Sequence, residues 1–117
     1  MTLKEQILAA AAAAKGKLTP VAAWGVPCKM RVMTGTERDA WESIVFPGAG
    51  KPTVKENFRA RLLVKVLCDD NGAAIFNDGE IAALSSNDSV ELDRLYDVAV
   101  KVNALSSANV DELTKNS

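Results

Sequence analysis

The sequence contains no histidine, and its two cysteines, Cys28 and Cys68, stand far apart. Without histidine the chain has no Ser-His-Asp or Cys-His catalytic set, and it lacks the commonest general base and the commonest zinc ligand. Cysteines so widely separated cannot form the CxxC pairs of thiolate metal sites, and they indicate reduced thiols in the cytoplasm. We therefore predict a protein that is not an enzyme and that holds no metal and no other cofactor.

The sequence also lacks a large excess of charge of either sign and a long apolar run. The 14 basic and 15 acidic residues give a net charge of −1, so the chain has no strong positive electrostatic field to attract the phosphates of DNA or RNA. Nucleic acid is therefore an unexpected partner. The run from Ile7 to Ala14 is mostly alanine and too short to span a bilayer, which predicts no membrane association. A length of 117 residues with 48% hydrophobic residues predicts one domain over 1–113 and a flexible tail over 114–117.

Helix starts are marked by a Thr, Asn or Asp that precedes a Glu by three residues, the spacing of a capping box. These pairs are Thr2/Glu5, Thr34/Glu37, Thr53/Glu56, Asn77/Glu80 and Asp88/Glu91. They predict helices over 3–15, from 34 to near 46, from 53 to 66, a short one from 77, and a longer one from 88 with apolar residues at helical spacing up to 105. The helix from 53 to 66 is the expected central helix, and a last turn is expected around 110–113.

The second and third of these helices each carry an apolar stripe. Ala40, Trp41, Ile44 and Val45 are expected on the buried face of the second helix, and Val54, Phe58, Leu62 and Val66 on that of the third.

Residues 26–33 instead alternate with period two, as in a half-buried strand. One face of this strand is expected to hold Val26, Cys28, Met30 and Val32, and the other Pro27, Lys29, Arg31 and Met33. Residues 18–24 supply an antiparallel neighbour. Because Pro20 and Pro27 lack a backbone N–H donor, they favour edge positions of a sheet. The predicted fold class is mainly α (α+β): a small helical domain with a short N-terminal β-hairpin.

Two segments resemble ligand-binding loops and fail position by position. Residues 48–53 resemble a phosphate-binding loop, but Val45 replaces its first glycine and Pro52 its Ser or Thr. Residues 69–72 resemble part of a calcium loop, but Leu67 occupies the first ligand position. We interpret the first segment as a linker and the second as a turn.

What remains is binding to other proteins, for which large apolar side chains are the usual anchors. The candidate interface residues are Leu3, Ile7, Trp24, Trp41, Phe46 and Phe58. For both tryptophans a place in the buried core is the competing interpretation.

The order of features along the chain resembles that of a known family. The segments that carry the resemblance are Leu3-Lys4-Glu5-Gln6-Ile7-Leu8, Trp24-Gly25-Val26 before the alternating strand, Thr36-Glu37-Arg38-Asp39 at a helix start, Glu56-Asn57-Phe58-Arg59-Ala60-Arg61-Leu62, the acidic turn from 69 to 76, and Leu92-Asp93-Arg94-Leu95. Over almost its whole length the chain resembles the tail assembly chaperones of long-tailed, siphovirus-type bacteriophages.

This resemblance implies a non-enzymatic protein that self-associates and coats the tape measure protein before the tail tube polymerises. It further implies action in the host cytoplasm, absence from the mature virion, and a frameshifted, extended form that recruits the tail tube protein. Two alternatives stay open. One is a small nucleic-acid-binding regulator that uses a basic patch of Arg59, Arg61 and Lys65 on a helix with Lys29 and Arg31 on a strand. The other is a structural head or tail completion protein.

Overall fold

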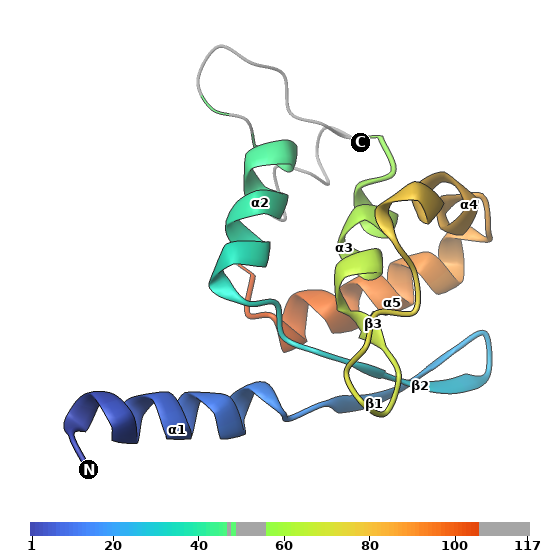
Figure 1. Ribbon diagram of the computed structural model, residues 1–117. Helices are drawn as coiled ribbons and strands as arrows, with labels where there is room; N and C mark the ends of the chain where they lie inside the picture. The colour runs from blue at the N-terminus through green and yellow to red at the C-terminus, as the bar shows by residue number, and fades with distance from the viewer. Residues whose placement is uncertain (47, 49–55, 106–117) are drawn as a thin grey trace.

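The computed structural model describes residues 1–46, 48 and 56–105 (Figure 1). The elements in chain order are α1 Leu3–Lys15, β1 Thr19–Ala23, β2 Val26–Met30, α2 Gly35–Val45, α3 Phe58–Val66, β3 Leu67–Cys68, the 3-10 turn η1 Asp78–Glu80, α4 Ile81–Ser85 and α5 Ser89–Val102. The predicted class, an α+β domain with an N-terminal β-hairpin, is confirmed. Within the described ranges no helix is both long and apolar enough to cross a membrane. The turn expected at 110–113 and the tail at 114–117 lie outside these ranges.

Most predicted helix starts are confirmed by their caps. The side chains of Thr2, Thr34 and Asp88 each accept a hydrogen bond from the backbone N–H three residues later. Thr53 and Val54, at the predicted start of this helix, lie outside the described residues. The continuous helix predicted from 53 to 66 is wrong, because α3 begins at Phe58. Asn57 precedes it with a left-handed φ of 56°, a conformation that asparagine tolerates and that a continuous helix cannot contain.

The strands form an antiparallel sheet in the order β1-β2-β3. The hairpin turn consists of Trp24 and Gly25, whose φ angles of 51° and 78° are both positive, as in the type I′ turns that join tightly paired strands. β3 pairs with β2 only at Lys29 and Met30, so no strand lies beside Pro27 on that side of β2. The missing backbone N–H of Pro27 therefore removes no hydrogen bond to β3.

The alternation predicted for residues 26–33 is only partly confirmed. Cys28 is half-buried and Met30 fully buried, whereas Val26 and Val32 are 64% and 54% exposed. Met33, which was expected on the face opposite Met30, is buried as well. The strand ends at Met30, and beyond it the chain no longer follows the pleat that sets period two.

α3 is the central helix, as predicted. Six of its nine residues are buried, namely Phe58, Ala60, Leu62, Leu63, Val64 and Val66. It packs against α5, whose buried residues are Leu92, Leu95, Tyr96 and Ala99, with Phe58 edge-on to Tyr96 at 5.4 Å between ring centres. α2 contributes Trp41 and Val45 to the same core. The core therefore lies around α3, with the sheet at one end (Figure 1).

Candidate protein-binding surfaces

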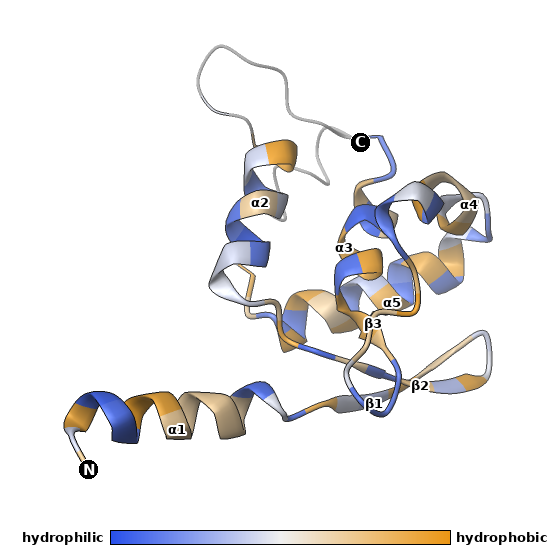
Figure 2. Ribbon diagram, in the orientation of Figure 1, coloured by the Kyte–Doolittle hydropathy of each residue, from blue (hydrophilic) through white to orange (hydrophobic). Residues whose placement is uncertain are grey.

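α1 contributes nothing to the core. None of its residues is buried, and Figure 1 shows it extended away from the rest of the domain. It forms because alanine is the best helix former, Thr2 caps its start and Lys15 complements the dipole at its end. Leu3 and Ile7 are 75% and 65% exposed and lie one turn apart on the same face, so they form an apolar stripe. Figure 2 shows that α1 carries both strongly hydrophobic and hydrophilic positions.

The tip of the β-hairpin carries an exposed aromatic group. Trp24 is 41% exposed and is fixed at two points by the first turn of α5. Its indole Nε1 donates to Oδ1 of Asp88 at 2.8 Å, and its backbone N–H donates to Oε2 of Glu91 at 2.7 Å. Arg94 completes this clamp by donating to Glu91 and to the carbonyl of Ala22. The hairpin tip is therefore held rigidly against α5.

The electrostatics of the clamp favour its charged form. The guanidinium of Arg94, followed by the backbone N–H of Trp24, lowers the pKa of Glu91 to about 2. The backbone N–H of Glu91, followed by the indole N–H, lowers the pKa of Asp88. Both carboxylates are ionised at neutral pH, as the N-terminal end of a helix also favours. The capping spacing indicated Asp88 and Glu91 only as a local helix cap. Both also hydrogen-bond to Trp24 in the hairpin turn, which is distant in sequence.

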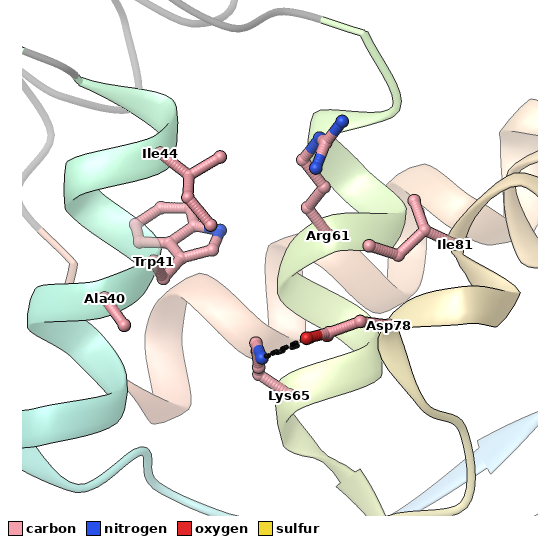
Figure 3. Close-up of a pocket in the computed structure, with 7 residues that line it drawn as sticks. All are labelled: Ala40, Trp41, Ile44, Arg61, Lys65, Asp78 and Ile81. Atoms are coloured by element: carbon pink, nitrogen blue, oxygen red, sulfur yellow. Dashed lines mark hydrogen bonds and ion pairs between the residues drawn. The ribbon is translucent and has the colours of Figure 1, made fainter.

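A groove separates α2 from α3 and contains a cavity of about 260 Å³ (Figure 3). Its lining residues are Ala40, Trp41, Ile44, Arg61, Lys65, Asp78 and Ile81. Lys65 forms an ion pair with Asp78 at 2.9 Å at its rim. Trp41 is 3% exposed, and its indole nitrogen has no hydrogen-bond partner among the described residues.

The six residues singled out from the sequence fall into three groups. Leu3, Ile7 and Trp24 are exposed, on α1 and on the hairpin tip. Trp41 is buried at the groove, and Phe46 is half-buried and edge-on to Trp41 at 6.2 Å between ring centres. Phe58 is buried against Tyr96 in the core. The structure brings Trp41 and Phe46 together, and it leaves Leu3, Ile7 and Trp24 on separate elements.

Two exposed positions were assigned to the wrong side of α2. Ala40 and Ile44 were expected in the core with Trp41 and Val45, yet both are exposed, with Ile44 at 47%. The stripe at helical spacing was correct, but it is wider than the face that α3 covers, so its edge lines the groove. Sequence spacing alone contains no signal for where a neighbouring helix stops covering such a stripe.

The basic residues considered for nucleic-acid binding are partly neutralised. Arg59 pairs with Asp93, Lys65 with Asp78, and Arg31 with Glu37. The Arg31 guanidinium holds the pKa of Glu37 down at about 2. The described residues contain no group of three or more side chains suited to hold a metal ion. At 69–72 the predicted turn is confirmed, because the carboxylate of Asp69 accepts two backbone N–H groups of that loop.

Comparison with known proteins adds a fold relationship to this geometry. No family model matches the sequence, and no curated protein matches it. Among solved structures, that of the bacteriophage HK97 tail assembly chaperone matches with a TM-score of 0.55 and 24% identity. The match covers 83% of this chain and 97% of that chain. The predicted resemblance is confirmed at the level of the fold.

Proposed function

We propose that this protein, which has the fold of a bacteriophage tail assembly chaperone, is itself a non-enzymatic tail assembly chaperone that binds the tape measure protein before the tail tube polymerises. The observation that carries the proposal is α1, a helix of 13 residues without a buried side chain on an otherwise packed domain. A chaperone needs an apolar surface that is open before its client arrives, and α1 supplies one.

The energetics of α1 favour a partner. An isolated helix of this length is marginal in water even when rich in alanine, and α1 gains no stability from packing in the monomer. Leu3, Ile7 and Leu8 are each more than half exposed, and burying such a side chain is worth roughly 1.5–3 kcal/mol. Covering the stripe would therefore stabilise both the helix and the complex. The alanines let a partner helix approach closely, because they add little bulk between large anchors.

Self-association belongs to the same proposal, since the α1 stripe of one copy is open to another copy as well as to the client. We also propose that the protein acts in the host cytoplasm, is absent from the mature virion, and reaches the tail tube protein through a frameshifted, extended form. Absence from the virion separates this role from that of a head or tail completion protein, because mass spectrometry of purified particles would detect the latter.

Co-expression with the tape measure protein from the same genome tests the proposal. The parent chain is expected to co-purify with it, whereas Ile7→Glu is expected to lose the complex because a charge replaces an anchor. Ala9→Glu is the matched control: it adds the same charge to the opposite face of α1 and should retain the complex. Circular dichroism should show equal domain stability for all three chains.

Each negative result has a distinct meaning. Failure of the soluble parent chain to co-purify with a soluble tape measure protein would contradict the chaperone role. Retention of the complex by Ile7→Glu would leave the role in place and exclude the α1 stripe as its binding surface. Salt-sensitive retention of the parent chain on heparin would favour the nucleic-acid alternative instead.

A further inference from the structure

We infer that the groove between α2 and α3 is a second docking site, which takes an aliphatic side chain of a partner protein together with a neighbouring carboxylate. The identity of the partner rests on the proposed function, whereas the chemistry of the site rests on the groove itself. Three features carry the inference: apolar walls, a buried donor that has no acceptor among the described residues, and a guanidinium that pairs with no carboxylate among them.

The walls of the cavity set the kind of group it accepts. Ala40 and Ile44 line it from α2, and Ile81 closes it from the start of α4 (Figure 3). A volume of about 260 Å³ lies just below the range of pockets for small-molecule ligands, which begins at about 300 Å³. The space is therefore suited to aliphatic side chains presented by a peptide rather than to a cofactor.

The indole of Trp41 supplies an unused donor. Its nitrogen is buried without a partner in the described part of the chain, and a buried donor left unpaired is costly enough to be rare. Figure 3 shows this nitrogen on the edge of the indole that faces Arg61 across the groove, beneath Ile44. Ile44 is 47% exposed, so uncovering the N–H requires a shift of this surface side chain and not of the core. A carbonyl or carboxylate oxygen entering the groove would satisfy this donor.

The charges at the rim select an acidic partner. Asp78 is already neutralised by Lys65, which leaves the positive charge of Arg61 in excess. Nε of Arg61 donates to the carbonyl of Glu56, and no carboxylate pairs with this guanidinium within the described ranges. Its terminal nitrogens remain suited to bidentate binding of a carboxylate.

The same charges disfavour the α1 helix of a second copy as the occupant. α1 carries Lys4 and Lys15 against a single acid, Glu5. Placing this helix in the groove would bring cations against Arg61, and like charges destabilise an interface. An acidic segment with aliphatic anchors, from a different protein, is the better match.

The two tryptophans make the site directly observable by NMR. In a ¹⁵N-labelled chain, each indole gives one N–H signal, and the signal of Trp41 is identified by its loss in Trp41→Phe or, by elimination, through Trp24→Phe. The probe is a blocked helical peptide of leucine, alanine and glutamate, and the control peptide has lysine in place of glutamate. The acidic peptide is expected to move the Trp41 signal downfield. The Trp24 signal, already hydrogen-bonded to Asp88, should stay in place.

Variants then test the role of charge. Arg61→Gln is expected to weaken binding of the acidic peptide about tenfold or more, as the loss of a charge-assisted hydrogen bond does. Lys17→Gln, which removes an exposed charge away from the groove, should leave the affinity unchanged.

Three results would overturn the assignment. These are no shift of the Trp41 signal, equal shifts with the lysine peptide, or a shift that follows protein concentration alone, which would make a second copy the occupant. Since the titration needs no tape measure protein, its failure is distinct from failure of the co-purification test.

Discussion

Replacing Asn103 should destabilise the domain more than any other change of a polar side chain described here. Asn103 is 5% exposed at the end of α5. Its Oδ1 accepts from the backbone N–H of Met33 at 2.7 Å, and its Nδ2 donates to the carbonyls of Ala99 at 3.1 Å and Arg31 at 3.4 Å. These bonds join the last turn of α5 to the segment between β2 and α2. Asn103→Ala removes all of them and leaves the N–H of Met33 buried without an acceptor.

The expected loss can be set from these bonds. Two good hydrogen bonds contribute about 1 kcal/mol each, and an orphaned buried donor adds roughly 1–3 kcal/mol, so we expect a loss of about 3–5 kcal/mol in unfolding free energy. For a domain of this size that corresponds to a fall in Tm of about 12–20 °C. Urea unfolding followed by circular dichroism measures the change, with an unchanged m-value as the check on two-state behaviour.

Asn87→Ala is the matched control for this prediction. Asn87 also donates from Nδ2 to carbonyls at the end of a helix, those of Ala83 and Leu84, but it is exposed, so water replaces the lost bonds. Its removal should cost less than about 0.5 kcal/mol. If Asn103→Ala and Asn87→Ala prove equally mild, the buried hydrogen bonds of Asn103 do not hold these segments together, and the reasoning is refuted.

Three further predictions concern stability and use the same unfolding measurement. Leu62→Ala should cost about 2–5 kcal/mol, because the side chain is fully buried in the central helix; a loss below 1 kcal/mol would contradict this packing. Gly25→Ala should cost about 1–2 kcal/mol through its φ of 78° alone, since an added Cβ meets no atom within 4 Å, whereas Gly16→Ala at φ −76° should be neutral or stabilising. The pKa of Glu37 is depressed from 4.5 to about 2 by Arg31, so its contribution is full above pH 4.5 and is lost as pH falls towards 2. The stability difference between the parent chain and Glu37→Gln should accordingly shrink across that window, and a constant difference would show that the ion pair contributes nothing.

Much of the fold was accessible from local signals. The bounds of α1 follow from Thr2, the alanine run and Gly16, and the turn at 24–25 follows from the strand pattern around it. The start of α3 was misplaced because a Thr and a Glu at capping distance outweighed Asn57, whose left-handed conformation breaks the chain into a turn. A capping box is defined by spacing, and spacing does not reveal which backbone conformation an intervening residue adopts.

The candidate surfaces divide along the same line. The α1 stripe was predictable, because a surface carried by one helix depends only on the order of residues in that helix and on nothing packing against it. The exposure of Trp24 was not, since the bonds that fix it come from Asp88 and Glu91, more than sixty positions away. The groove at Trp41 depends on how α3 and α4 are placed against α2, which no local pattern contains. A binding site shared between elements therefore becomes visible only after the fold is known.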